Sequence, residues 1–288
     1  MTTTLIKPTL EAEVEGLGEI YRIDRPFNKA LESLREQKTK VISSRELAYA
    51  RIKEGGDSSL CNSGSYTREG FLYLKNEPVL VALNSPLLDL QLAEQAVEAN
   101  RKGNYLSTDK KVYEQYKEQA EQDKNKILQE RKVLIFPKRE NYEIPTNEFN
   151  ENELTLFLFK DQAENYGNFL KENEINEMPV WLLDKNYVNS KEGSILTQLW
   201  LLDLDGRSGV EGNWGFFCDS RVRGMFEKPS EAGRVFESGS KAKKARLELP
   251  YTKRQVHKVY DIVSGVRDGR LPKSKLEKVV KFLDRLNK

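Results

Sequence analysis

The sequence predicts a mixed α/β protein, of the α/β or α+β class, with mixed sheet regions flanked by helices and a small basic helical hairpin at the C-terminal end. Three observations predict it. Short apolar runs typical of strands alternate with capped, amphipathic segments typical of helices. Aromatic residues make up 9% of the 288 residues and are spread along the chain, which indicates packed cores. The final seventy residues also differ sharply in charge from the rest.

The first 145 residues predict one mixed α/β region. Residues 18–23 alternate as a strand does, and Pro26 opens a helix with a single apolar stripe. Ser43 and Glu46 fit the S-x-x-E capping box, which begins a second helix that ends near Glu54. Three elements follow, namely a hairpin, an amphipathic helix and a long, highly charged surface helix, at 70–83, 88–101 and about 107–131.

Residues 146–226 predict a second α/β region, which could share one core with the first. The runs at 132–136 and 154–159 are almost continuously apolar, so we expect both to be interior strands of a covered sheet. The connection between them is rich in Pro and Asn and is the best internal boundary. A helix at 161–172 and strands at 179–183 and 195–202 follow, which gives a βαβ-like order from 154 to 183.

Beyond residue 226 the composition changes. Residues 227–245 are poor in apolar side chains and predict a linker. Residues 246–288 predict a basic module of two helices, the first capped by Thr252 and the second begun by a capping box at Ser274 and Glu277.

Composition limits the classes of protein that fit. No stretch approaches the eighteen uninterrupted apolar residues of a transmembrane helix, and the N-terminus lacks the pattern of a secretory signal. Two cysteines, Cys61 and Cys218, with the single His257, cannot form a disulfide scaffold or a four-ligand zinc site. We therefore expect a soluble, cytoplasmic protein without a membrane partner.

The charge is strongly segregated. Residues 219–288 hold nineteen Lys and Arg against nine Asp and Glu, a net charge of +10, whereas the whole chain carries only +2. A cationic surface of this kind binds polyanions through counterion release. The expected nucleic-acid contacts are Lys243, Lys244, Arg246, Lys253, Arg254, Lys258, Lys275 and Lys278. The alternatives are a solubilising face, or one that docks on the acidic remainder of the same chain.

A second candidate site lies between residues 201 and 224. Asp203 and Asp205 follow a predicted buried strand, where open α/β sheets commonly place ligand-binding groups. With Asp219, and with Glu211 as a further ligand, they would supply the carboxylates of a Mg²⁺ site for chemistry on a phosphate-containing substrate. The alternative is a glycine-containing turn at Asp205 in which the aspartates bond their own backbone.

The polar loop from Ser58 to Gly70 is the third candidate. Its serines and backbone amides could bind an anion, and Cys61 could act as a nucleophile only with His257 as its base. Almost two hundred residues separate these two, so we expect Cys61 to be buried and inert. The three tryptophans, Trp181, Trp200 and Trp214, fall in or beside apolar runs, and packing explains them.

Three functions therefore follow as hypotheses. The first is a nucleic-acid-associated protein that binds a polyanion through its basic C-terminal region. The second is a metal-dependent enzyme that uses the Asp cluster at 203–219. The third is a protein–protein interaction module, in which acidic body and basic tail pair within or between chains.

Overall fold

The structure is a computed structural model that describes residues 8–137, 140–204, 208–213 and 221–226. The chain divides into two compact units, Met1–Glu231 and Ala232–Lys288, and all described residues belong to the first. Every structural statement below concerns these described residues.

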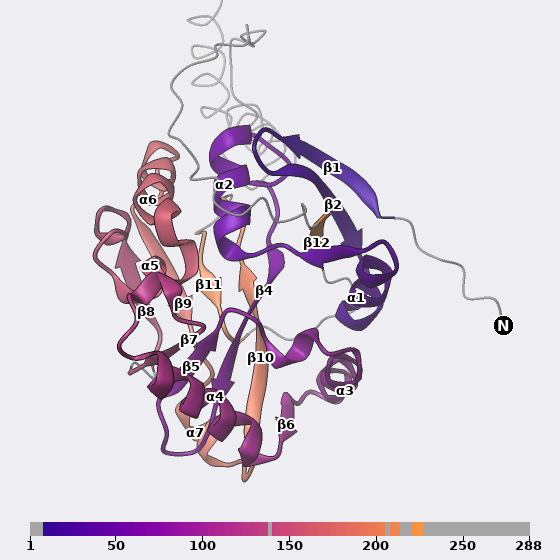
Figure 1. Cartoon of the computed structure of the whole chain (residues 1–288), viewed down its shortest axis with the longest axis vertical. Helices are drawn as coiled ribbons and strands as arrows, with labels where there is room; N and C mark the ends of the chain where they lie inside the picture. The colour runs from indigo at the N-terminus through magenta and orange to yellow at the C-terminus, as the bar shows by residue number, and fades with distance from the viewer. Residues whose placement is uncertain (1–7, 138–139, 205–207, 214–220, 227–288) are drawn as a thin grey trace, which may run out of the picture. The chain divides into compact units, whose positions relative to one another are not determined.

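The described strands join in one mixed sheet (Figure 1). They are β1 (Thr9–Val14), β2 (Gly18–Asp24), β3 (Thr39–Val41), β4 (Ser65–Tyr73), β5 (Val79–Ala82), β6 (Leu106–Thr108), β7 (Val133–Phe136), β8 (Tyr142–Pro145), β9 (Glu177–Trp181), β10 (Ser194–Leu201), β11 (Val210–Glu211) and β12 (Arg221–Phe226). The main path runs β1-β2-β12-β4-β10-β11-β9-β8, with β3, β5, β6 and β7 paired alongside it. The pairs β9–β11 and β4–β12 are parallel, and the others are antiparallel.

Helices cover both faces of this sheet. The α-helices are α1 (Phe27–Glu36), α2 (Ser44–Glu54), α3 (Leu90–Arg101), α4 (Lys110–Asp123), α5 (Glu153–Phe159), α6 (Ala163–Glu172) and α7 (Lys185–Asn189). Short 3-10 turns lie at Pro86–Leu88, Leu128–Glu130, Thr146–Glu148 and Lys160–Gln162. One apolar core joins the sheet to α2, α5 and α6, and a second joins it to α1, α3 and α4. Figure 1 shows the two groups, with α5 and α6 on one side and α1 and α3 on the other.

These features confirm the mixed α/β class. Ser43 caps α2 through a capping box with Glu46, as its spacing predicts. The hairpin of β4 and β5 is antiparallel, with Phe71 opposite Val81. Strands also form at the apolar runs around β7, β9 and β10. The predicted linker and basic helical hairpin, at 227–245 and 246–288, lie outside the described residues. Residues on either side of 145 contribute strands to the same sheet.

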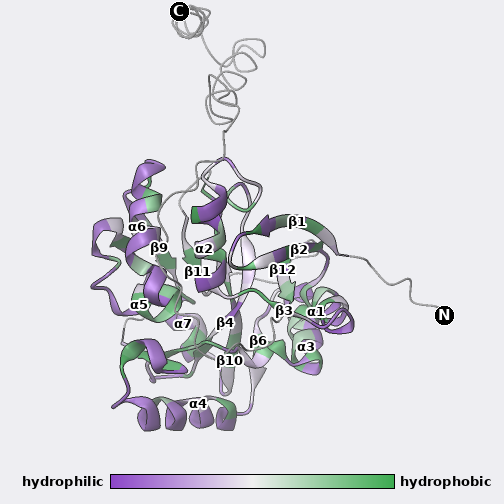
Figure 2. Cartoon of the chain, turned by 45° about the horizontal axis from the view of Figure 1, so that its top comes forward, coloured by the Kyte–Doolittle hydropathy of each residue, from purple (hydrophilic) through white to green (hydrophobic). Residues whose placement is uncertain are grey.

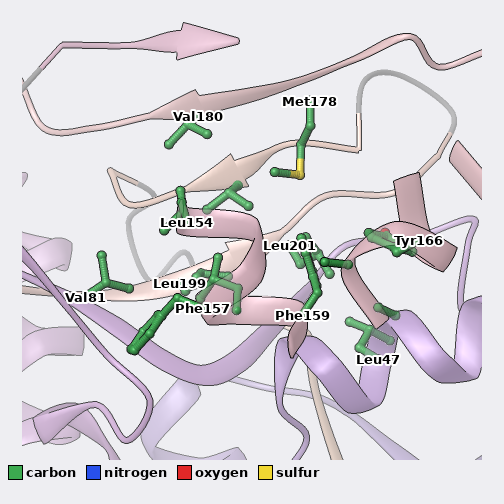
Figure 3. Packing of buried hydrophobic residues seen from close by; sticks show 14 of the residues in the cluster. Leu47, Val81, Leu154, Phe157, Phe159, Tyr166, Met178, Val180, Leu199 and Leu201 are labelled. Carbon is green, nitrogen blue, oxygen red and sulfur yellow. The ribbon is translucent and has the colours of Figure 1, made fainter. Parts of the chain in front are cut away.

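The run at 154–159 corrects the prediction from the sequence, because it forms helix α5 and not an interior strand. Asn152 caps α5, and its side chain accepts hydrogen bonds from the backbone N–H groups of Leu154 and Thr155. The helix is apolar almost all round because it is buried in the larger core, where Figure 3 shows Phe157 and Leu154 with Leu199 of β10. The expected βαβ order from 154 to 183 is therefore wrong, and the observed order is helix, helix, strand.

Helix α4 lies on the surface, as the sequence predicts, but its bounds differ. Asp109 caps it, and it spans Lys110–Asp123 instead of about 107–131. Its buried residues are Tyr113, Ala120 and Asp123, and its remaining turns are polar in Figure 2. None of the helices in the described part of the chain is long and apolar enough to cross a lipid bilayer.

Candidate functional site

The candidate site lies where β9, β10 and β11 run side by side. β11 is only two residues long and is paired on both sides, so that Glu211 lies opposite Trp200 of β10 and beside Trp181 of β9. Matched residues on neighbouring strands point to the same face of a sheet. The Glu211 side chain therefore lies on the same face of the sheet as two half-buried tryptophans, one on each neighbouring strand. Gly209, two residues before Glu211, has no room for a side chain, because a Cβ there would collide with the Trp181 ring.

Glu211 is a buried carboxylate whose Oε2 atom has no hydrogen-bond partner among the described residues. Its exposed fraction is 9%, and its Oε2 atom is buried and accepts no hydrogen bond. Burial disfavours the ionised form, and the nearby charge of Asp203 acts in the same direction, so the pKa of Glu211 is raised to about 7. No described cation contributes to this pKa. The group is thus poised between its two protonation states near neutral pH.

Backbone hydrogen bonds hold Asp203 close to this site. The N–H of Leu202 donates to the carbonyl of Gly209 (2.9 Å), and the N–H of Ser208 donates to the carbonyl of Asp203 (3.0 Å). Ser208 is fully buried and adopts a φ of 38°, in the left-handed region. These bonds return the chain from β10 to β11 and bring the two carboxylates together.

On the other side of Glu211, tyrosines fix the chain that leaves β11. The hydroxyl of Tyr105 donates to the carbonyl of Asn213 (2.5 Å), and the ring of Tyr105 packs edge-on against Tyr187 at 5.3 Å between centroids. Burial raises the pKa of Tyr105, and the charges of Tyr187 and Glu211 add to the shift. Tyr73 and Thr197 both donate to the carbonyl of Gly212. The backbone around Glu211 is therefore fixed from both sides.

A fully buried arginine, Arg223 of β12, holds the neighbouring loop. Its guanidinium forms a bidentate ion pair with Glu11 of β1, at 2.6 and 2.8 Å. It also donates to the Ser63 hydroxyl (2.7 Å), and to loop carbonyls at Ser59, Ser63 and Gly64. Each nitrogen of the guanidinium thus has an acceptor for its hydrogen bonds. This arrangement is what allows a charge to be buried without a large loss of folding free energy.

A second fully buried arginine, Arg51 of α2, binds the same loop from the other side. It donates to the carbonyls of Leu60 (2.9 Å) and Ser63 (3.3 Å), and to the hydroxyl of Tyr166 (2.8 Å). Tyr166 in turn bonds the hydroxyl of Ser208 (3.1 Å), which connects this loop to the chain that leads into β11. The frame that fixes the backbone near Glu211 thus extends through α2 and α6.

A third buried polar cluster surrounds Glu69 on β4. Its Oε2 accepts hydrogen bonds from the backbone N–H and from the hydroxyl of Ser44, both at 3.0 Å. The side-chain amide of Gln198 donates to the carbonyls of Thr67 and Glu69. Burial raises the pKa of Glu69, while the charge of Arg68 and hydrogen bonds from the Thr67 side chain and the Ser44 backbone oppose the shift. Glu69, unlike Glu211, is supplied with donors by its own fold.

The residues predicted for metal binding are only partly described. Asp203 lies beside Glu211, whereas Asp205 and Asp219 lie outside the described residues. Across the described ranges, no three His, Cys, Asp or Glu side chains are grouped as a metal site would require. The Mg²⁺ site therefore stays a prediction. The eight basic residues from Lys243 to Lys278, and His257, also lie outside the described residues.

The Ser58–Gly70 loop has a structural role in its first half. Cys61 is fully buried, as expected, and burial raises the pKa of its thiol, which keeps it protonated and unreactive. Its carbonyl accepts a hydrogen bond from the N–H of Leu204. The residues that sequence reasoning missed are Arg51 and the two indoles, Trp181 and Trp200, for which the apolar runs predict packing alone. Trp200 does pack, against Tyr66 at 4.7 Å between ring centroids.

Comparisons with known proteins identify a fold. No family model matches the chain, and no curated protein matches it. A solved structure described as "Accommodation of massive sequence variation in Nanoarchaeota by the C-type lectin fold" is similar to it, with a TM-score of 0.54 and 17% sequence identity. The match covers 73% of this chain and 99% of that one. At this identity the likeness shows that the two chains share a fold and shows nothing of function.

Proposed function

We propose that this chain is a binding protein with two recognition parts. One is the surface of its body at Glu211, Trp181 and Trp200, which takes a partner molecule. The other is the basic C-terminal region, which associates with a polyanion such as nucleic acid. A single observation carries the first part: Glu211 is buried, its Oε2 accepts no hydrogen bond, and it is paired in the sheet with a tryptophan on each side.

The body supports this role because its frame and its surface are separate. A buried, unpaired carboxylate lowers stability, and groups with strongly perturbed pKa values cluster at functional sites. The surrounding backbone is held by Arg223, Arg51 and Tyr166, none of which contributes to the exposed surface. In the similar solved structure, the C-type lectin fold is described as accommodating massive sequence variation. We propose the same division here, with a constant buried frame and an adaptable surface beside β11.

A fragment screen followed by NMR tests the first part. Ligands that bind the body are expected to shift the indole N–H resonances of Trp181 and Trp200, and to lose most of their affinity in Trp181→Ala. The matched control is Glu177→Gln, which changes an exposed carboxylate at the opposite end of β9. This variant should bind the same ligands with wild-type affinity. Ligands that gather elsewhere on the body, or bind Trp181→Ala equally well, would contradict the proposal.

The polyanion role is a second candidate, favoured by the position of the charge. Residues 219–288 carry a net charge of +10, and the division between the two compact units, after Glu231, lies close to the start of this basic part. Such a region binds nucleic acid through counterion release, so affinity should fall steeply with salt. The alternative of acidic and basic parts pairing between chains predicts salt-sensitive self-association instead.

Charge neutralisation in the full chain tests it. A variant with the eight expected contacts, Lys243, Lys244, Arg246, Lys253, Arg254, Lys258, Lys275 and Lys278, changed to Gln should bind DNA and RNA at least tenfold more weakly. It should also show a shallower dependence on salt. The control changes eight exposed lysines of the body, Lys38, Lys75, Lys102, Lys110, Lys111, Lys124, Lys171 and Lys185. Equal losses in both variants, or none in either, would remove the C-terminal region as the binding part.

A further inference from the structure

The chemistry at Glu211 selects one class of ligand. An anion would be repelled by the Glu211 carboxylate when that group is ionised. A purely apolar ligand would complete the burial of Glu211 without giving it a donor, which raises the cost of its ionised form. A cation would supply both things that Glu211 lacks among the described residues, a hydrogen-bond donor and an opposite charge.

The two indoles favour the same class. Trp181 and Trp200 flank Glu211 on the same face of the sheet. The face of an indole attracts ammonium and guanidinium groups, and does so more strongly than the ring of any other side chain. A carboxylate paired in the sheet with a tryptophan on each side can thus offer one cation both an ion pair and cation–π contacts.

The small exposed fraction of Glu211 limits which cations can reach its carboxylate. Glu211 is 9% exposed and the indoles beside it are half-buried, so only the tip of a slender group can reach the carboxylate. Lysine and arginine carry their charge at the end of an apolar stem, which can lie along an aromatic surface while the charged group enters. Tryptophan and arginine are also the side chains most often found at the energetic centre of protein interfaces.

We propose that the Glu211 site binds a lysine or arginine side chain presented by a protein partner, with the charged group on the Glu211 carboxylate and the stem against Trp181 and Trp200. The inference rests on the proposed role of this surface in recognition, and it adds the chemical class of the ligand.

The described groups that face Glu211 allow the pH dependence to be stated. Asp203, which follows β10, and Tyr105, which precedes β6, are the titratable groups coupled to it, and neither brings a positive charge near neutral pH. Because the pKa of Glu211 is raised to about 7, the ionised fraction rises from about one tenth at pH 6 to about nine tenths at pH 8. Affinity for a cation should therefore rise roughly tenfold over this interval.

Matched peptides test the inference on the full-length protein. The probes are the acetylated, amidated tripeptides Ala-Lys-Ala and Ala-Arg-Ala, with norleucine or glutamate in the central position as the neutral and anionic controls. Binding is followed by the indole N–H resonances at pH 6 and pH 8. From the shifts of the Trp181 and Trp200 resonances, we expect the cationic peptides to bind at least tenfold more tightly than the norleucine peptide at pH 8.

Two variants make the test specific. Glu211→Gln preserves the shape of the side chain, and it should abolish both the cationic preference and the change between pH 6 and pH 8. Glu177→Gln removes an exposed carboxylate of the same strand region and should leave both intact. If Glu211→Gln fails to fold, Trp181→Leu should still weaken the cationic peptides more than the norleucine peptide.

The outcomes separate this inference from the proposed function. Equal binding of norleucine and lysine peptides, or unchanged lysine binding in Glu211→Gln, would overturn the cationic class while leaving the surface as a recognition site. Binding of none of the peptides would also overturn it, and the fragment screen then decides whether the surface recognises another class. A polyamine that binds as tightly as the peptides would overturn the assignment to a protein side chain.

Discussion

Two buried charged groups in this fold differ in their ion pairs and hydrogen bonds. Arg223 and Glu11 are both almost completely buried, and they form a bidentate pair in which loop carbonyls use the remaining donors of the guanidinium. Glu211 is buried to a similar degree, yet no described cation contributes to its pKa and its Oε2 accepts no hydrogen bond. The two sites lie in one sheet, with Arg223 on β12 and Glu211 on β11.

The difference distinguishes a structural role from a recognition role. A buried charge whose hydrogen bonds are all formed fixes the surrounding backbone. Removing either partner leaves the other charge buried and unpaired. A buried charge left incomplete weakens the fold until something binds to it. The variants below test this distinction in order of decreasing expected effect.

The largest effect is expected for Arg223→Met, which turns the paired charge into an unpaired one. Loss of the guanidinium leaves Glu11 buried without a partner and removes the donors that hold the loop at Ser59–Gly64. We expect the free energy of unfolding in urea to fall by about 4 kcal/mol. Arg221→Met, which breaks a more exposed pair with Asp24, is the control and should cost about 0.5 kcal/mol. Similar losses in the two variants would contradict a special role for the buried pair.

The next effect concerns Glu211→Gln and has the opposite sign. The pKa of Glu211 in the folded protein, about 7, lies above that of an unfolded glutamate. The folded state therefore binds more protons between these two values, and wild-type stability falls as the pH rises from about 4.5 through 7. Glutamine removes this dependence, so the variant should be more stable than wild type at pH 8, by on the order of 2 kcal/mol.

The comparison of the two proteins at several pH values measures this effect. The difference in unfolding free energy should shrink toward zero near pH 4, where Glu211 is protonated in both states. A variant that is less stable than wild type at pH 8 would show that the carboxylate has a stabilising partner after all.

Ser44→Ala sharpens the comparison at Glu69, the buried carboxylate that its own fold supplies with donors. Removing the hydroxyl takes one hydrogen bond from Glu69 Oε2 and a contact with the hydroxyl of Thr67. We expect a loss of about 1.5 kcal/mol in the thermal or urea unfolding free energy. Ser190→Ala, at an exposed serine, should change it by less than about 0.5 kcal/mol. Equal effects would mean that the donors at Glu69 do not support its burial.

The smallest effect is expected at the surface. Arg45 and Asp161 form a short bidentate pair, but both side chains are partly exposed. Arg45→Met should lower the free energy of unfolding by about 0.5 kcal/mol, and the loss should decrease in high salt. A loss as large as that of Arg223→Met would break the comparison between buried and exposed pairs.

Local signals in the sequence predicted much of the fold. The S-x-x-E spacing at Ser43 places α2, and the apolar runs around Pro78 place the β4–β5 hairpin. The apolar run at 154–159 misled the prediction because a fully buried helix and a buried strand have the same continuous apolar pattern. Its cap, Asn152, is the signal that could have separated them.

The candidate site was less predictable because it depends on contacts between distant segments. Asp203 and Glu211 stand out in the sequence as carboxylates that follow an apolar strand. The pairing of Glu211 with Trp181 arises from a parallel ladder between residues thirty positions apart, and the register of β10 shifts between Gln198 and Trp200. A shift of one residue sends a side chain to the opposite face, and no local pattern records it.

The pKa of Glu211, followed by carboxyl ¹³C NMR with and without the lysine tripeptide, tests the central claim most directly. We expect a pKa of about 7 in the free protein, and a fall of about one unit or more when the cationic peptide saturates the site, because a tenfold preference for the ionised form corresponds to one unit. A free pKa in the ordinary range for glutamate, or a raised pKa that the lysine peptide leaves unchanged, would contradict the account.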